Sequence, residues 1–268
     1  PISSLGGTGV FVKELEDALL SKSVDFVVHS LKDMPTDSPP GLTIAAVMDR
    51  VYPSDVLLSN GGLSLDQLPA GARLATSSRR RLAQIKAIRQ DPEFVAIRGN
   101  VPTRIKKMQD KQCDAMILAC AGLKRLNLEE HIVQTFKNEE CTPAVGQGAL
   151  AVQCLSANEN LLSLLGRLDE PDVRVEITAE RTFLNILGGG CSVPIGVNAR
   201  YLADYNNLTI YGCVASLDGK QIIRHKMSDD NKSPEETGKQ LAEWMLDSPA
   251  KQILENLKTS QPNLISPP

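Results

Sequence analysis

Cys191 stands on a glycine-rich stretch, GGGCSVPIG at residues 188–196, just past a helical pattern that ends near Leu187. Three glycines let the backbone approach a ligand or adopt positive φ, so this thiol could hold a ligand. The same pattern is typical of a helix C-cap followed by a turn, with the cysteine as a small buried residue. The spacing is compatible with both interpretations.

A second stretch, TSSRRRLAQ, places Arg80 and Arg81 in the first turn of a predicted helix that Ser77 or Ser78 would cap. A helix N-terminus offers free N–H groups and positive potential, so arginines there favour an anion site. Further arginines fall at the same edge of the predicted sheet, after its other strands: Arg98, Arg104 and Arg125.

The charge around these arginines is locally basic, although the whole chain carries a net charge of -3. Residues 79–107 contain nine Lys or Arg against two acidic residues, which predicts an anion-facing surface. The plain alternative is a solvated basic face. Guanidinium groups match carboxylates or phosphates in pairs. The sequence has no GxxxxGK[ST] motif and no GxGxxG after a strand, which favours carboxylates over nucleotide phosphates.

A third stretch, HSLKDMP, follows an apolar segment at residues 24–28 that reads as a buried strand. Lys32 and Asp33 should therefore lie at the carboxyl end of that strand, where clefts form. A carboxylate there could hold a ring N–H and offset positive charge on a substrate, whereas the alternative is a turn aspartate before Pro35. We expect His29 to be a hydrogen-bonded packing residue.

The elements that must position these residues alternate between strands and helices. Residues 72–120 read as strand, helix, strand, helix, strand, which implies a parallel sheet. From residue 171 one long helix precedes three strands that should pair antiparallel, and two helices close the chain, the first capped by Ser233. A length of 268 residues suits two or three domains.

Composition excludes several classes of protein. No apolar run approaches the length needed to span a bilayer, and aromatic residues make up only 4%, which disfavours a stacking surface for single-stranded nucleic acid. Six cysteines form no CxxC pair and no zinc-ligand spacing. We therefore expect reduced thiols, no structural metal, and no nucleic-acid or membrane partner.

Six strings in this order, VVHSLKDMP, ATSSRRR, IRGNVPTR, LACAGLKRL, PAVGQGAL and GGGCSVPIG, resemble the hydroxymethylbilane synthase (porphobilinogen deaminase) family. The resemblance covers nearly the whole chain. It implies an α/β fold of three domains: two domains like type II periplasmic binding proteins around a cleft, and a C-terminal α/β domain with a small antiparallel sheet. The expected boundaries are residues 1–48 with 149–168 for domain 1, 54–142 for domain 2 and 171–268 for domain 3, with hinges at 49–53 and 143–148.

The resemblance also implies an activity. Enzymes of this family join four porphobilinogen molecules head to tail, release ammonia each time, and free hydroxymethylbilane with water. Cys191 matches the cysteine that carries a dipyrromethane cofactor through a thioether. Asp33 matches the catalytic aspartate, which contacts pyrrole nitrogens and stabilises a cationic azafulvene-like intermediate.

Other family roles carry over to positions that match its motifs. The positions matching cofactor-binding residues are Lys32, Asp33, Ser78, Arg80, Arg81 and Cys191. The positions matching substrate-binding residues are Ser30, Arg98, Arg104, Arg125 and Gln147. Family members carry an N-terminal segment with a strand and cleft-lining residues ahead of the point where this sequence starts. A polypeptide beginning at Pro1 would lack part of its first sheet.

Two alternatives to the synthase are considered. A binding protein for a small multi-anionic solute would use the same cleft without a cysteine adduct, and a nucleic-acid module would bind with strong salt dependence. The synthase predicts porphobilinogen as substrate, a monomeric state and a cytoplasmic location, or a plastid if the source is photosynthetic or apicomplexan.

Overall fold

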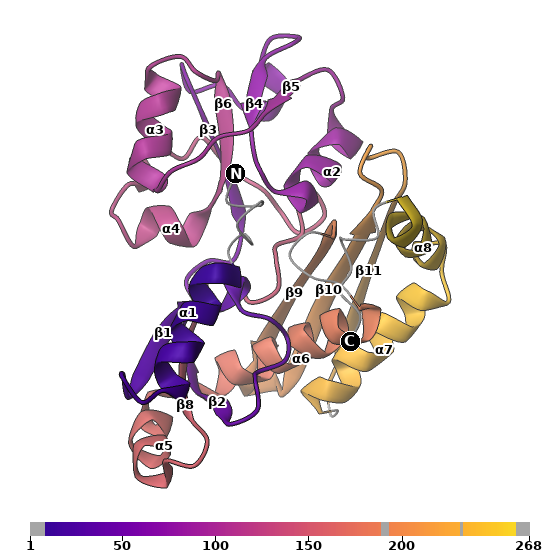
Figure 1. Ribbon diagram of the computed structural model, residues 1–268. Helices are drawn as coiled ribbons and strands as arrows, with labels where there is room; N and C mark the ends of the chain where they lie inside the picture. The colour runs from indigo at the N-terminus through magenta and orange to yellow at the C-terminus, as the bar shows by residue number, and fades with distance from the viewer. Residues whose placement is uncertain (1–8, 189–192, 231–232, 261–268) are drawn as a thin grey trace.

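The computed structural model describes residues 9–188, 193–230 and 233–260. Three sheets, each with its own helices, make up a mixed α/β fold (Figure 1). We call the parts built on these sheets the first, second and third units. The α/β class expected from the sequence is confirmed.

The first unit has a three-stranded sheet in the order β1-β8-β2, in which β8 pairs antiparallel with both neighbours. Segments far apart in the sequence therefore lie side by side, as the indigo and salmon ribbons of Figure 1 show. Its elements are α1 (Gly9–Leu20), β1 (Phe26–Ser30), η2 (Leu31–Asp33), β2 (Leu42–Met48), β8 (Leu150–Leu155), α5 (Glu159–Leu165) and η5 (Gly166–Leu168).

Strand β1 differs from the expectation of a buried strand at 24–28. It begins two residues later and has alternating burial, with Phe26 47% and Val28 52% exposed. Among the described strands β1 pairs only with β8, so it is an edge strand. An apolar run cannot reveal this, because exposure of one face depends on which strands and helices lie beside it.

The second unit has a five-stranded sheet in the order β5-β4-β6-β3-β7. Strand β4 pairs parallel with β5 and β6, which confirms the predicted strand–helix alternation, whereas β3 runs antiparallel to β6 and β7. Its elements are β3 (Asp55–Ser59), η3 (Leu65–Gln67), β4 (Arg73–Ala75), α2 (Arg79–Ile88), β5 (Glu93–Val95), α3 (Val101–Gln109), β6 (Ala115–Ala119), α4 (Cys120–Lys124), η4 (Glu129–His131) and β7 (Gln134–Thr135).

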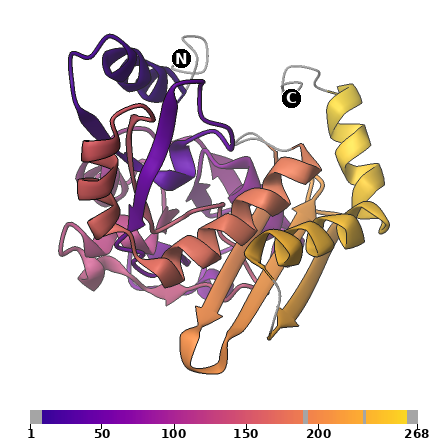
Figure 2. The same cartoon turned by 90° about the horizontal axis from the view of Figure 1, so that it is seen from below.

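The third unit has an antiparallel sheet in the order β11-β10-β9, as predicted. Figure 2 shows α6 and α7 lying across this sheet, and Phe183, Leu241 and Met245 fill the core beneath them. At its surface, the rings of His225 and Trp244 stack with centroids 3.8 Å apart. Its elements are α6 (Pro171–Leu187), β9 (Ile195–Leu202), η6 (Ala203–Tyr205), β10 (Asn207–Ala215), β11 (Ile222–Asp229), α7 (Pro234–Leu246) and α8 (Ala250–Ser260).

Two crossing segments join the first and second units: residues 49–54 between β2 and β3, and residues 136–149 between β7 and β8. The predicted hinges at 49–53 and 143–148 lie within them. The first crossing segment is fixed to the third unit by Arg50, whose buried guanidinium contacts Glu176 at 2.8 Å and Glu180 at 2.5 Å on α6. The crossing segments are thus anchored where all three units meet.

Candidate functional site

The first unit contributes η2, which follows directly on β1. Ser30 ends the strand with an exposed side chain, Leu31 is buried, and Lys32 and Asp33 are half-buried. The backbone N–H of Leu31 donates to the carbonyl of Ala149 at 3.1 Å, which ties η2 to the second crossing segment. Lys32 and Asp33 therefore lie at the strand end predicted for them.

Gly146 sets how closely the second crossing segment packs on η2. Its φ is +66°, and a Cβ there would lie 1.9 Å from Leu31 Cδ2. Any larger residue at this position would require the buried Leu31 side chain to shift. Glycine is therefore required here both for its backbone angle and for the close approach.

The electrostatics of η2 depend on charges from both units. Burial raises the pKa of the Asp33 carboxyl, although Lys32 and His29 oppose the shift. Burial and the Arg81 guanidinium lower the pKa of Lys32, against the opposing influence of Asp33 and Asp55. Because Arg81 and Asp55 belong to the second unit, η2 lies within electrostatic range of the start of α2.

His29 is a packing residue, as expected. It is 6% exposed, and its Nε2 lies 3.0 Å from Gln153 Oε1 on the neighbouring strand β8. Gln153 in turn donates to Glu16 Oε1 at 3.2 Å. The imidazole is thus held in a hydrogen-bonded chain inside the first unit.

The start of α2 is built as the sequence predicts. Ser78 is the N-cap residue, and its Oγ accepts a hydrogen bond from the backbone N–H of Arg81 at 3.4 Å. Arg80 and Arg81, in the first turn, are only 5% and 8% exposed. Their guanidinium groups reach into the protein rather than out to solvent, which is costly unless a carboxylate compensates them.

Asp55, the first residue of β3, is that carboxylate. It is fully buried and accepts hydrogen bonds from Arg80 Nη1 at 2.6 Å and from Arg81 Nη2 and Nε at 2.7 and 3.0 Å. Burial alone would raise its pKa, but the two guanidinium groups hold the pKa of this carboxyl well below its usual range. Asp55 therefore stays ionised and fixes both arginines.

Gln147 joins the same buried network from the second crossing segment. Its Nε2 donates to Asp55 Oδ1 at 2.9 Å and to the carbonyl of Pro53 at 2.5 Å. Its Oε1 accepts from Arg81 Nη2 at 3.5 Å. The thiol of Cys141 also donates to Asp55, at 3.4 Å, and burial raises its pKa so that it stays protonated. The network thus connects both crossing segments with α2.

Sequence reasoning missed Asp55, although a signal was present. It opens the otherwise apolar strand DVLLS directly after the first crossing segment. An acidic residue at the start of a strand that is buried throughout needs a cationic partner. The arginine-rich stretch after the next strand offers such partners.

The remaining predicted arginines lie in different surroundings. Arg104 on α3 donates from Nε to the carbonyl of Gly99 at 2.6 Å, and burial together with Arg81 lowers its pKa, which places it near the start of α2. Arg98 has an exposed side chain and lines a separate pocket of about 300 Å³ with Lys107. Arg125 contacts the crossing segments. The structure therefore brings Arg104 near Arg81 at the start of α2, whereas Arg98 lines a separate pocket.

Cys191 lies outside the described residues. The described chain stops at Gly188, whose φ of +64° makes it the C-cap of α6, and resumes at the buried Val193. The predicted end of the helix near Leu187 is confirmed.

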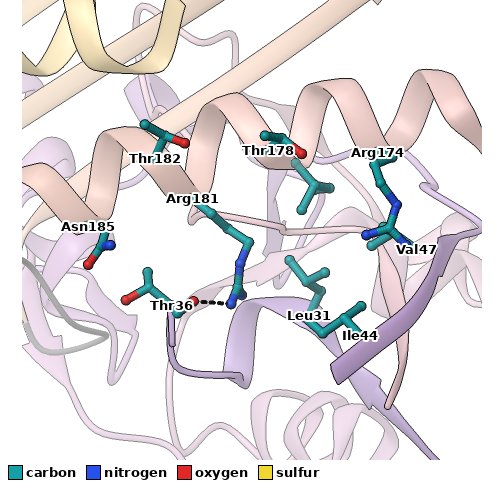
Figure 3. A pocket seen from close by; sticks show the side chains of 10 residues that line it. Leu31, Thr36, Ile44, Val47, Arg174, Thr178, Arg181, Thr182 and Asn185 are labelled. Carbon is teal, nitrogen blue, oxygen red and sulfur yellow. Dashed lines mark hydrogen bonds between the residues drawn. The ribbon is translucent and has the colours of Figure 1, made fainter. Parts of the chain in front are cut away.

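A groove of about 240 Å³ separates α6 from the first unit close to η2 (Figure 3). Arg181 points from α6 across this groove, and its Nη2 donates to the carbonyls of Pro35 and Thr36. Burial lowers the pKa of Arg181, which indicates that its guanidinium is largely withdrawn from water. The segment that follows Asp33 is therefore held by the helix that leads to Cys191.

Within the described residues there is no group of three His, Cys, Asp or Glu side chains that could hold a metal ion. The described helices likewise include none that is both long and apolar enough to cross a membrane. Cys113, Cys120, Cys141, Cys154 and Cys213 are buried free thiols.

Comparison with known proteins identifies matching families. The family described as "Porphobilinogen deaminase, dipyromethane cofactor binding domain" matches residues 1–163, and "Porphobilinogen deaminase, C-terminal domain" matches residues 174–247. The porphobilinogen deaminase of Brevibacillus brevis is 47% identical over 94% of this chain and 81% of its own. That of Carboxydothermus hydrogenoformans is 44% identical over 96% of this chain and 82% of its own.

Solved structures resemble parts of the chain at low identity. The periplasmic binding protein of an arginine transport system from Legionella pneumophila aligns with a TM-score of 0.34 and 11% identity. The alignment covers 56% of this chain and 68% of that one.

Proposed function

The chain belongs to the porphobilinogen deaminase family, and we infer from this membership that it joins four porphobilinogen molecules head to tail into hydroxymethylbilane. Each addition releases ammonia, and the product is a precursor of tetrapyrroles. The observation that carries this function is identity of 47% and 44% to relatives named porphobilinogen deaminase over 94% and 96% of the chain. The alternative of a binding protein without catalysis is not favoured.

Cys191 is the proposed attachment point of the dipyrromethane, through a thioether. The residues of η2 and of the start of α2 fit such a group, because two pyrrole rings bring four carboxylates and these residues hold an excess of positive charge. Lys32, Arg80, Arg81 and Arg104 there outnumber the two carboxylates described above. When bound, the dipyrromethane supplies the primer to which substrate is added.

Repulsion among these cations supports a polyanionic ligand. Burial lowers the pKa of both Lys32 and Arg104, and the Arg81 guanidinium lowers both further, so Arg81 is close enough to destabilise the positive charge on each of them. Carboxylates of a ligand would stabilise such an arrangement, and each charge-assisted hydrogen bond contributes roughly 1.5 to 3 kcal/mol. Arg80 and Asp55 act behind them and orient Arg81.

Asp33 is the proposed catalytic residue. Loss of ammonia leaves positive charge on the pyrrole, and a carboxylate that accepts the ring N–H offsets this charge. Its half-buried position strengthens that interaction, because fewer waters compete for the carboxylate. Burial also raises its pKa, which moves the group toward the range in which it can take up and return a proton.

The remaining matched residues have proposed binding roles around this centre. Ser30 ends β1, Ser78 caps α2, and Gln147 joins the second crossing segment to Asp55 of the second unit. Arg98 and Arg125 are proposed to bind acetate and propionate groups of the substrate or the growing chain.

The intact mass of freshly purified protein tests the covalent attachment. We expect a species heavier than the sequence by one dipyrromethane, and loss of that increment in Cys191→Ala. Cys120→Ala, which removes a buried thiol, should keep the increment. An unmodified mass in the folded, active wild type would contradict the attachment at Cys191.

A monomeric, cytoplasmic enzyme is proposed as well. The five buried cysteines are free thiols, which suits a reducing compartment. Light scattering on the eluted protein would measure its molar mass, and twice the chain mass would contradict the monomer.

A further inference from the structure

Arg125 holds both crossing segments at once. From the end of α4, its Nη2 donates to the backbone carbonyl of Asp49 at 2.7 Å and to that of Gly148 at 2.8 Å. The same nitrogen and Nε also contact Asp49 Oδ2, at 3.0 and 3.2 Å. One side chain of the second unit thus forms hydrogen bonds at both places where the chain leaves and re-enters the sheet of the first unit.

The gripped backbone has an unusual conformation. Asp49 has a φ of +51° and Gly148 one of +93°, and a Cβ at Gly148 would lie 2.1 Å from the carbonyl oxygen of Val51. The Val51 N–H points at the same two carbonyls, 2.9 Å from that of Asp49 and 3.1 Å from that of Gly148. The two crossing segments therefore meet in one hydrogen-bonded knot, comprising Asp49, Val51, Gly148 and the Arg125 guanidinium.

We propose that Asp49 is a positioning residue: its carboxylate keeps Arg125 on this knot until a carboxylate of the substrate replaces it on the Arg125 guanidinium. The carboxylate of Asp49 neutralises Arg125 and orients it toward both carbonyls. A rotation of the second unit relative to the first must break these contacts, because Arg125 moves with the second unit. Replacement of the Asp49 carboxylate by a substrate carboxylate on Arg125 thereby couples substrate binding to movement of the crossing segments.

Several features favour exchange over a permanent ion pair. The side chains of Arg125 and Asp49 are 30% and 48% exposed, so water and ligands can reach them. No hydrogen bond from Arg125 Nη1 is found within the described part of the chain, which leaves that nitrogen for an incoming carboxylate. The exchange step rests on the proposed function, in which Arg125 binds substrate carboxylates. The knot in the free protein does not depend on that function.

Asp49→Asn is the variant that isolates the charge. Asparagine adopts left-handed backbone angles readily, so the φ of +51° is kept together with the backbone carbonyl that Arg125 contacts. Asp110→Asn is the matched control, because it removes the charge of an exposed ion pair with Lys106 elsewhere in the second unit. Both variants are studied as full-length holoenzyme.

Hydrogen exchange at the Val51 amide measures the knot directly. In the free protein at low salt we expect Asp49→Asn to raise its exchange rate about three- to five-fold, as suits loss of a half-exposed ion pair. Asp110→Asn should leave the rate unchanged. Added salt should raise the rate in the wild type but not in Asp49→Asn, a comparison that holds up even if the variant is less stable. If the exchange rate of the Val51 amide is unchanged both in Asp49→Asn and in the wild type with added salt, Asp49 does not hold the knot and the proposal is overturned.

Porphobilinogen tests the exchange step. Its addition to the wild type should raise the Val51 exchange rate as Asp49→Asn does, and the variant should show a lower KM, because Arg125 no longer carries a competing carboxylate. A purely structural role would leave KM unchanged or raise it. If porphobilinogen leaves the wild-type rate unchanged, the coupling is wrong. A chain without turnover would instead refute the proposed function, while the free-state exchange would still decide the role of Asp49.

Discussion

Asp55→Asn removes one buried negative charge and changes little else in shape. Asn retains a side-chain oxygen that can accept from one guanidinium, but Arg80 and Arg81 would then share two positive charges without a compensating carboxylate. Both arginines are almost fully buried, so solvent cannot take over that role. The variant therefore tests whether Asp55 holds the start of α2 together.

The expected cost follows from this burial. Removing one partner of a buried ion pair costs about 3 to 5 kcal/mol, because the remaining charge is left uncompensated. Asp114→Asn is the matched control in the same unit, since its pair with Arg73 is 38% and 40% exposed. Exposed pairs contribute roughly 0 to 1 kcal/mol, so the control should lose no more than that.

Urea unfolding followed by far-UV circular dichroism measures the free energy of unfolding of both variants. The pKa of Asp55 is depressed in the folded protein, so its stabilisation is present above the ordinary aspartate pKa of 3.8 and is lost as the pH falls below it. The difference between wild type and Asp55→Asn should hold from neutral pH to about pH 4 and narrow at lower pH.

Two results would refute this reasoning. A loss in Asp55→Asn no larger than that in Asp114→Asn would show that the buried network does not depend on the charge. A difference that stayed constant through acidic pH would show that the loss arises from something other than the ionised carboxylate.

Other changes probe the remaining parts of the site. Asp33→Asn should keep the fold and much of the cofactor yet lose most turnover, and near-normal turnover would contradict the role of Asp33. In the wild type the raised pKa of Asp33 places a fall of activity at acidic pH, above pH 3.8, and any residual activity of the variant should lack this fall. Arg98→Leu should raise KM for porphobilinogen about ten-fold or more, whereas unchanged steady-state kinetics would remove Arg98 from the site. Gly148→Ala should destabilise the protein more than Gly62→Ala in thermal unfolding, because both have positive φ but only the former would meet the Val51 carbonyl; equal losses would leave only the backbone angle as the cause.

Local signals in the sequence predicted the parts of the fold that depend on neighbouring residues. Ser78 and Ser233 cap α2 and α7 as expected, because a cap needs only the next three residues. The parallel pairing around β4 follows from the helices that connect its strands, and the antiparallel third sheet follows from short turns. Lys32 and Asp33 were placed at the end of β1 for the same reason.

What the sequence could not supply depends on contacts between distant segments. The pairing of Asp55 with two arginines about 25 residues later requires knowing how β3 and α2 meet in space. The contact of Arg125 with Asp49 spans 76 residues and two units. Each residue is plausible alone as a surface charge, and only the fold shows which charges are withdrawn from water.

The ring stack on the third unit has a practical consequence for spectroscopy. Trp244, on α7, is the sole tryptophan of the chain, and its ring stacks on that of His225 on β11. Tryptophan emission therefore reports on one sheet of three and is silent on events confined to the other two. A melting curve recorded from tryptophan emission would therefore track the C-terminal part alone.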